Sequence, residues 1–179
     1  MDHPQLTELI RLAQAGSSPA FAELVDLHYD TIHRFAWRWC GHRTDAEDIA
    51  QQSCIKLAQN LRQFRFQSAF SSWLYRLVIN CAQDWLRSQQ RHLHGALPEN
   101  EPAFDSGRAE DAIELLQLLE QLGGMGPGMQ ETALLVHAEG LSHAEAGEVL
   151  GVSESTISWR IHTMRKHMNR REHLANGTA

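Results

Sequence analysis

The sequence predicts an all-α protein made of two small helical domains joined by a flexible acidic linker. Apolar residues recur at spacings of three and four along the 179 residues, which is the repeat of a helix. Alternating runs rich in Val, Ile and Thr, typical of strands, are missing. Between residues 92 and 111 the helical repeat is lost and two prolines interrupt the chain. We therefore expect domains at 1–91 and 112–173, a linker at 92–111 and a disordered tail at 174–179.

The first domain contains three predicted helices, each with one apolar face. They run from about Pro19 to Cys40, from about Thr44 to Leu61, and from an N-cap at Ser71 or Ser72 to about Arg87. Gly41 is a plausible stop for the first of them. The predicted inward residues are Phe21, Leu24, Val25, His28, Ile32, Phe35 and Trp39, then Ile49, Ala50, Cys54, Leu57, Ala58 and Leu61, then Trp73, Leu74, Leu77, Val78, Cys81 and Trp85.

A file of polar residues marks the outer face of the third predicted helix. At about 100° per residue, Arg76, Asn80, Gln83 and Arg87 fall together opposite the apolar face. A solvated face is one interpretation, since outer helix faces are commonly charged. A face that binds a nucleic-acid strand is the other, because arginines hold phosphates and an amide can both donate and accept.

The loop before this helix, residues 63–71, carries three phenylalanines. Phe64, Phe66 and Phe70 are candidates for contacts with unpaired bases, because every base has a face on which an aromatic ring can stack. Phenylalanines that precede a helix also serve as hydrophobic staples within a core. The sequence leaves both roles open.

Charge is unevenly spread over the chain, whose formal net charge is −6. From residue 62 to 91 there are five arginines against one acid, and from 160 to 171 there are five basic residues and no acid. Residues 99–120 hold seven acids and one arginine. Two basic surfaces separated by an acidic connector are typical of a protein that contacts a polyanion at two places.

The second domain carries the pattern of a helix-turn-helix. Helical spacing at Ile113, Leu116 and Leu119 stops at the glycine-rich run 123–128, and we expect at most three helices between Met129 and about Arg171. Ser142 precedes Glu145 by three residues, which is the spacing of a capping box. That helix runs to Leu150, Gly151 makes the turn, and Ser153 can cap the next helix.

The last helix combines an apolar line with a polar face that could enter a major groove. Ile157, Ile161, Met164 and Met168 form the line, and Ser155, Trp159, His162 and Lys166 lie opposite. A large aromatic residue on the outer face favours a partner surface. Packing of Trp159 against a neighbouring helix of the same domain is the alternative.

Composition excludes several other classes of protein. No apolar run approaches the roughly 20 residues needed to span a bilayer, and the acidic, polar start MDHPQLTELI is unlike a signal peptide, so we expect a cytoplasmic protein without a membrane segment. Cys40, Cys54 and Cys81 lack the spacing of a disulfide framework or zinc site and are expected in the core. The sequence has no phosphate loop, nucleophile elbow or paired metal-ligand motif, so no enzyme, metal or cofactor is predicted.

Two motifs in this order resemble those of the extracytoplasmic-function (ECF) sigma factors of the sigma-70 superfamily. They are D-A-E-D at residues 45–48 and S-x-W-L-Y-R-x-x-x-N ending at Asn80, followed by the acidic linker and the helix-turn-helix. The resemblance covers nearly the whole chain and implies domains of the sigma region 2 and region 4 types. It implies promoter recognition with core RNA polymerase in a stress or envelope response under an anti-sigma factor, with no catalysis of its own. We expect the free chain to be monomeric.

The resemblance also implies three sets of site residues. The polymerase-binding set is Asp45, Glu47, Asp48 and Gln51. The minus-ten DNA set is Arg65, Trp73, Arg76, Asn80, Gln83 and Arg87, with Asn80 near the pocket for an extruded base. The minus-thirty-five DNA set is Ser155, Thr156, Ser158, Trp159, His162, Arg165 and Lys166.

The last helix departs from the commonest family pattern, in which Lys-Ser-Arg is followed by Arg one turn later. Ser158-Trp159-Arg160 and Thr163 stand there instead, so fewer cations can anchor phosphates. An alternative function is that of a stand-alone helix-turn-helix regulator, which would leave the D-A-E-D helix and the arginine-rich file without a role.

Overall fold

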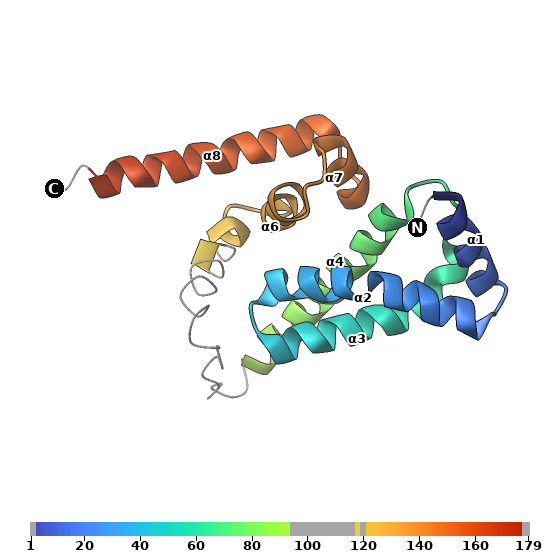
Figure 1. The fold of residues 1–179 in the computed structure, drawn as a ribbon. Coiled ribbons are helices and arrows are strands. Elements are labelled where there is room, and N and C mark those ends of the chain that lie inside the picture. The colour runs from blue at the N-terminus through green and yellow to red at the C-terminus, as the bar shows by residue number, and fades with distance from the viewer. Residues whose placement is uncertain (1–2, 94–116, 119–120, 177–179) are drawn as a thin grey trace. The chain divides into compact units, whose positions relative to one another are not determined.

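The computed structural model describes residues 3–93, 117–118 and 121–176, with side chains for 4–89, 117–118 and 121–169. Every regular element in these ranges is helical, which confirms the predicted all-α class (Figure 1). Contacts between Cα atoms divide the chain into two compact units, Met1–Ala109 (unit 1) and Glu110–Ala179 (unit 2). In the described part of the chain no helix is both long enough and apolar enough to cross a membrane.

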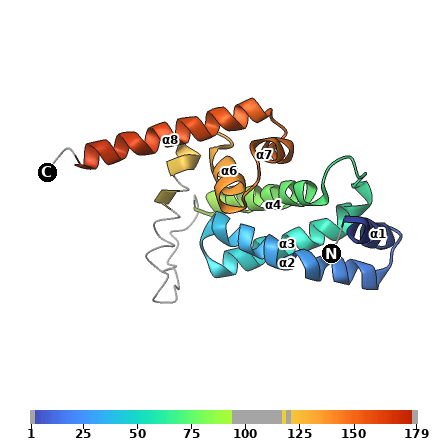
Figure 2. The ribbon, with the colours of Figure 1, turned by 45° about the horizontal axis from the view of Figure 1, so that its top comes forward.

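Unit 1 is a bundle in which three long helices bury their apolar faces against one another. They are α2 (Ser18–Cys40), α3 (Arg43–Asn60) and α4 (Phe70–Leu93). Each of them contacts the other two (Figure 2). Fully buried residues include Leu24, Ile32 and Phe35 of α2, Ile49 and Leu57 of α3, and Val78 of α4. The predicted inward faces are therefore largely confirmed, with the exception that Ala58 is exposed.

Local capping sets the ends of α2 much as the sequence predicts. The Ser17 hydroxyl accepts a hydrogen bond from the Ala20 amide, and Pro19 stands in the first turn, where its missing N–H costs nothing. Gly41 closes the helix in the left-handed conformation at φ 66°, and its N–H donates to the Trp37 carbonyl.

A first helix that the sequence analysis did not predict packs on this bundle. It is α1 (His3–Gln14), and its Leu9 and Ile10 are buried against α2. The Gln14 side chain donates to the carbonyls of Leu61 and Phe64, both at 2.8 Å. These two bonds tie α1 to the short 3-10 turn η1 (Leu61–Gln63) and to the start of the phenylalanine loop.

The start of α4 differs from the predicted serine cap. The helix begins at Phe70, and the Trp73 amide donates to the Ala69 carbonyl. Phe70 and Ser72 are both buried. Packing of this first turn therefore favours a helix that begins before the two serines. At its other end α4 continues to Leu93, so residues 92–93, predicted as linker, are helical.

Unit 2 contains the predicted helix-turn-helix, formed by α7 (His143–Leu150) and α8 (Glu154–Asn176). The capping box is present, because the Ser142 N–H donates to Glu145 Oε2 at 2.8 Å and the Glu145 N–H donates to Ser142 Oγ at 3.2 Å. Gly151 ends α7 at φ 67°. Ser153 Oγ accepts from the Thr156 amide at 3.2 Å, as predicted for the cap of α8.

A third helical segment supports the pair. It comprises α6 (Met129–Ala133), which continues as the π-helical turn η2 (Leu134–Ala138). Arg160 of α8 reaches across to it and donates from one guanidinium nitrogen to Gly128 O and Thr132 Oγ1, each at 3.3 Å. The guanidinium lies where a Cβ at Gly128 would stand, so Gly128 leaves the room for this contact.

Three predictions about unit 2 need correction. Gly123 and Gly124 are helical, so the break in the glycine-rich run begins at Met125. Met168 is 43% exposed, because the apolar line ends with the buried Met164. Residues 174–176, predicted as disordered tail, belong to α8. The predictions for Ile113, Leu116 and Leu119, for residues 94–111 of the linker and for residues 177–179 of the tail lie outside the described residues.

Gly147→Ala should destabilise unit 2. Gly147 lies inside α7, where an added Cβ would stand 2.8 Å from the Val152 carbonyl oxygen, a backbone atom that cannot turn aside. We expect a loss of about 1–3 kcal/mol, measured as the free energy of opening from native-state hydrogen exchange of the α8 amides.

Gly124→Ala is the matched control for this substitution. It adds the same methyl group to a helical glycine with no atom within 4 Å, so it should be neutral or stabilising by up to about 1 kcal/mol. Equal protection of the α8 amides in the two variants would contradict the close approach of the turn to α7.

Candidate nucleic-acid and protein interfaces

The outer face of α4 borders a polar groove of about 260 Å³. Three residues of the minus-ten set, Trp73, Arg76 and Asn80, line it together with Leu77. Arg76 and Asn80 are exposed, whereas Trp73 is half-buried. Of the remaining members of the set, Arg65 is exposed on the preceding loop, Gln83 is half-buried and Arg87 is exposed further along α4. The structure thus brings three of the six residues to one groove.

The opposite wall of this groove comes from residues that the sequence analysis missed. Lys56 and Asn60 of α3 and Gln63 of η1 line it. Asn60 donates to the Lys56 carbonyl at 2.8 Å and accepts from Gln63 Nε2 at 3.0 Å, so both amides are held in place. Their spacing of four and then three residues is that of one helix face, a signal present in the sequence.

An acid stands within the polar file of α4. Asp84 lies one turn beyond Asn80 and contacts two cations, Lys56 Nζ at 2.7 Å and Arg87 Nη1 at 2.7 Å. The hydrogen bond from Lys56 lowers the pKa of Asp84 below its usual value. In the free protein Arg87 therefore faces a carboxylate as well as solvent.

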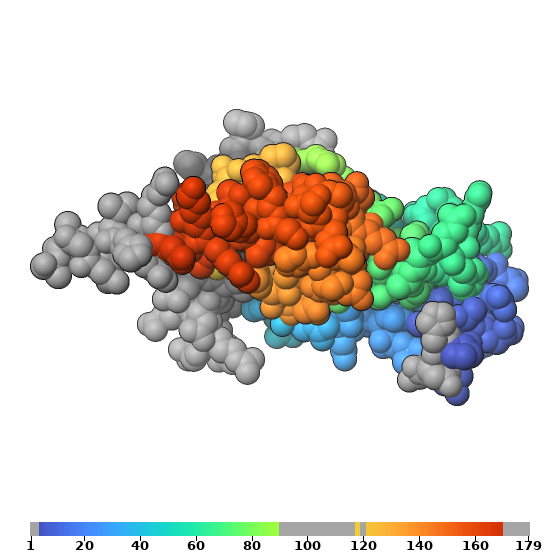
Figure 3. Space-filling model, turned by 90° about the horizontal axis from the view of Figure 1, so that it is seen from above, coloured from blue at the N-terminus to red at the C-terminus, as the bar shows by residue number. Residues whose placement is uncertain are grey.

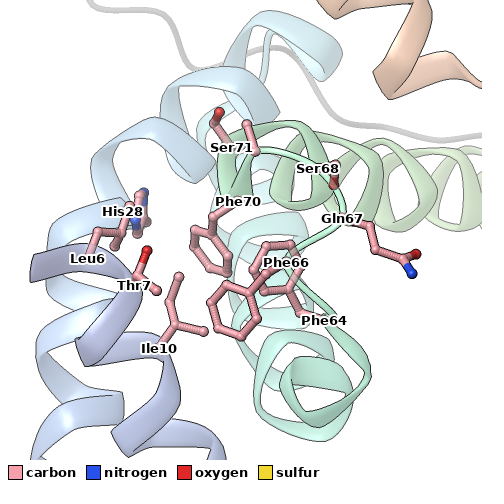
Figure 4. Close-up of a pocket in the computed structure, with 11 residues that line it drawn as sticks. Leu6, Thr7, Ile10, His28, Phe64, Phe66, Gln67, Ser68, Phe70 and Ser71 are labelled. Atoms are coloured by element: carbon pink, nitrogen blue, oxygen red, sulfur yellow. The ribbon is translucent and has the colours of Figure 1, made fainter. Parts of the chain in front are cut away.

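An aromatic pocket of about 400 Å³ lies between α1, α2 and the phenylalanine loop (Figure 4). Phe64 and Phe70 are buried, which confirms a core role for these two rings, while Phe66 is 39% exposed. Phe66 has φ 56°, a conformation that costs a bulky L-residue energy, and the Arg11 guanidinium lies 5.5 Å from its ring centroid. The loop is thus held in a strained shape by packing from α1.

One wall of the pocket carries a buried nitrogen. His28 Nε2 is shielded from solvent and has no hydrogen-bond partner, and burial lowers the pKa of His28. Its ring packs 5.1 Å from that of Phe70, and Thr7 and Ser71 add hydroxyl groups to the lining. A polar ligand edge that entered the pocket could satisfy His28.

The aromatic pocket and the polar groove are separate, but aromatic rings that line the pocket pack against a ring that lines the groove. Phe64 and Phe70 of the pocket lie 5.6 and 5.8 Å, centroid to centroid, from Trp73 of the groove. Asn80 lines the groove and is not among the residues that line the pocket.

The acidic cluster at the start of α3 divides into a partly buried and an exposed part. The Asp45 carboxylate lies 3.4 Å from His42 Nδ1 and accepts a hydrogen bond from Trp85, and burial raises the pKa of Asp45 despite these contacts. Glu47 is paired with Arg43 at 3.0 Å. Asp48 and Gln51 are exposed, and Ile55, which shares their helix face, is 48% exposed. An exposed apolar residue beside polar ones is typical of a protein-binding surface. The sequence analysis did not identify Ile55 as part of this surface.

Most members of the minus-thirty-five set are exposed on α8, part of whose surface Figure 3 shows in orange to red. Trp159 is 58% exposed, so it does not pack against a neighbouring helix of its unit. Ser158 is hydrogen-bonded to His143 Nδ1 at 2.9 Å, which links the outer faces of α7 and α8. Thr156 is half-buried, and the other members of the set, Ser155, His162, Arg165 and Lys166, are exposed.

The three cysteines are free thiols in or near the core of unit 1. Cys81 is buried, and Cys40 and Cys54 are half-buried. Burial raises the pKa of Cys40 to about 11, so this thiol stays protonated at neutral pH. Across the described residues, no three His, Cys, Asp or Glu side chains gather to hold a metal ion.

Comparison with known proteins places this geometry in a family. Residues 24–92 match the family model described as Sigma-70 region 2. The chain is 32% identical over 166 residues to the ECF RNA polymerase sigma factor SigE of Mycolicibacterium smegmatis, covering 89% of this chain and 63% of that protein. It is also 32% identical over 165 residues to the ECF RNA polymerase sigma factor SigM of Mycobacterium tuberculosis, covering 91% and 82%.

A solved structure shares the fold. It is the sigma factor RpoE in complex with the anti-sigma factor NepR from Bartonella quintana, with a TM-score of 0.63 and 20% identity over 84% of this chain and 94% of that chain. The match over the α2–α4 bundle and the identity to SigM over most of its length lead to the same assignment. This chain belongs to the ECF sigma factors of the sigma-70 family.

Proposed function

We propose that this protein binds core RNA polymerase and directs it to promoters, with unit 1 contacting the minus-ten element and unit 2 the minus-thirty-five element. The observation that carries the proposal is the polar groove of unit 1. It combines two cations, three amides and the half-buried ring of Trp73 on one surface, beside a pocket with aromatic walls. A single DNA strand needs such a surface, since phosphates require cations and unpaired bases require stacking partners.

Asn80 reads a base in the groove, and Arg76 and Lys56 hold the backbone. Asn80 is exposed at the groove and its amide can donate and accept on a base edge. The neighbouring amides of Asn60 and Gln63 are already fixed by hydrogen bonds, so they add base contacts at a low cost in side-chain entropy.

The aromatic pocket accepts an unpaired base. Its volume of about 400 Å³ and its phenylalanine walls suit a flat aromatic ligand, and His28 Nε2 offers an unsatisfied polar group to the base edge. Asn80 then does not contact this base, because Asn80 lines the adjacent groove.

Unit 2 places the outer face of α8 in the major groove. Ser155, Trp159 and His162 can reach base edges, and Arg165 and Lys166 can reach phosphates. Arg160 is held by Gly128 and Thr132, so it adds little to phosphate binding. Duplex binding by the free protein is accordingly weak and sensitive to salt.

The exposed face of α3 formed by Asp48, Gln51 and Ile55 contacts core polymerase. Asp45 supports this face from within, since its carboxylate holds Trp85 of α4 and His42. An anti-sigma factor is a further partner, because the fold is shared with a sigma factor solved in such a complex. Run-off transcription with purified core polymerase separates this function from the alternative of a stand-alone helix-turn-helix regulator, which would give no transcript.

Asp48→Arg should weaken binding to core polymerase while leaving the fold intact. Asp48 is exposed, so reversing its charge alters the proposed contact surface and little else. Affinity for core enzyme, measured with a fluorescent label on the sigma factor, should fall roughly tenfold. Glu8→Arg is the control, because it reverses the same charge at an exposed position of α1, and it should bind as the wild type does. Wild-type affinity of the Asp48 variant would remove this face from the interface.

Asn80→Ala should change which base is preferred at one position of the minus-ten element. The loss at that position should be on the order of 1–3 kcal/mol. Arg76→Ala should instead weaken all sequences nearly equally, because a phosphate contact carries no base information. The measurement is transcription by the reconstituted holoenzyme from a promoter library with single-base changes in both elements.

Trp159→Ala serves as the control from the other unit in the same library. It should alter preference in the minus-thirty-five element and leave the minus-ten profile unchanged. An Asn80→Ala profile that is a uniformly scaled copy of the wild-type profile would show that Asn80 does not read a base.

A further inference from the structure

One carboxylate in unit 1 occupies the space between two cations of the proposed strand-binding face. Asp84 Oδ2 lies 2.7 Å from Lys56 Nζ, and Asp84 Oδ1 lies 2.7 Å from Arg87 Nη1. Lys56 belongs to α3 and lines the polar groove, whereas Arg87 belongs to α4. The two oxygens of a single side chain therefore join the groove to the far end of the polar file.

Asp84 lies on the face that a strand would follow. In a helix, residues four apart lie one above the other, so Arg76, Asn80 and Asp84 form one row with Arg87 close beside it. A phosphate that approached Lys56 or Arg87 would meet the Asp84 carboxylate at the same nitrogen atoms. Like charges at this range repel, and the repulsion is felt by any polyanion regardless of its sequence.

The three side chains remain accessible to solvent, so their pairing is reversible. The exposed fractions of the side chains are 34% for Lys56, 52% for Asp84 and 64% for Arg87. Exposed ion pairs of this kind contribute little to stability, so a bound nucleic acid can displace them. The pairing therefore lowers strand affinity without closing the site.

We propose that Asp84 acts as an internal competitor for phosphate, which holds Lys56 and Arg87 in the free protein and reduces its affinity for any single-stranded nucleic acid. This inference rests on the proposed function, because it takes the α4 face as the strand-binding face. As a consequence, the free protein has a low affinity for polyanions of any sequence. Strand binding then depends on the extra contacts that polymerase and base recognition supply.

Asp84→Asn tests the proposal in the full-length free protein. The probe is a short, fluorescently labelled, mixed-sequence single-stranded DNA, and the readout is its anisotropy over a series of salt concentrations. The variant should bind about 2- to 5-fold more tightly, which is the range of an exposed charge pair. Its plot of log K against log salt should steepen by about 0.7 for each cation that gains a phosphate contact.

Two further variants separate release of the cations from a change in net charge. Glu23→Gln removes the same charge from an exposed site on α2 and should change affinity less than Asp84→Asn does. In a Lys56→Gln background the gain from Asp84→Asn should shrink, since one of the two released cations is absent. Asp84 is exposed enough that Asp84→Asn should keep the wild-type circular dichroism spectrum.

Three results would overturn the role of Asp84: weaker binding by Asp84→Asn, a gain no larger than that of Glu23→Gln, or an undiminished gain in the Lys56→Gln background. Arg76→Ala in the same assay tests the underlying function separately. If Arg76→Ala weakens binding but Asp84→Asn does not strengthen it, the strand-binding face stands and only the competitor role fails. If Arg76→Ala leaves binding unchanged, the strand-binding face itself is wrongly assigned.

Discussion

Burial of the apolar face of α4 against α2 and α3 is the constraint on which the rest of unit 1 depends. Leu74, Val78, Cys81 and Ala82 are buried in this contact, so the rotation of α4 about its own axis is fixed. Once that rotation is set, Arg76, Asn80 and Asp84 must point away from the core. The same packing brings Lys56 and Asn60 of α3 to the edge of that row. The proposed strand-binding surface is thus a consequence of the core.

How far the sequence predicts the fold depends on whether a segment carries its own signal. The long helices α2, α3 and α4 have apolar repeats over several turns, and the caps at Gly41, Ser142 and Ser153 are local, so these features were predictable. The helix α1 has only a short apolar repeat, and its position depends on burial of Ile10 and on the bonds from Gln14 to a distant turn. The helical spacing of Leu6, Leu9 and Ile10 could have predicted α1 as a helix, whereas the tertiary contacts that set its position have no signature within its twelve residues.

The candidate site shows the same division between local and long-range information. The polar file of α4 and the open face of α8 follow from helical spacing alone. The groove, in contrast, is formed by two helices, and the pairing of Asp84 with Lys56 joins residues 28 apart in sequence. From the sequence alone, Arg160 is one of the basic residues of α8 that could bind phosphate. In the structure its guanidinium is instead hydrogen-bonded to Gly128 and Thr132. Which charges remain available can be decided only after packing is known.

In both units, contacts within the protein reduce the number of cations that are available for binding DNA. Around one groove, unit 1 has Arg76, two fixed amides and Lys56, which is paired with Asp84, and an aromatic pocket lies alongside. Among the α8 side chains that the structure describes, up to residue 169, Arg165 and Lys166 lie exposed, whereas Arg160 is held within the unit. Affinity from phosphate contacts grows with the number of cations that reach the backbone, so two cations on each surface give only a modest part of the affinity for DNA. Under the proposed function, base and shape contacts from Trp159 and its neighbours supply the rest of minus-thirty-five recognition. Such contacts are short-ranged and require a fixed orientation, which a sigma factor gains when polymerase holds both of its domains on the promoter.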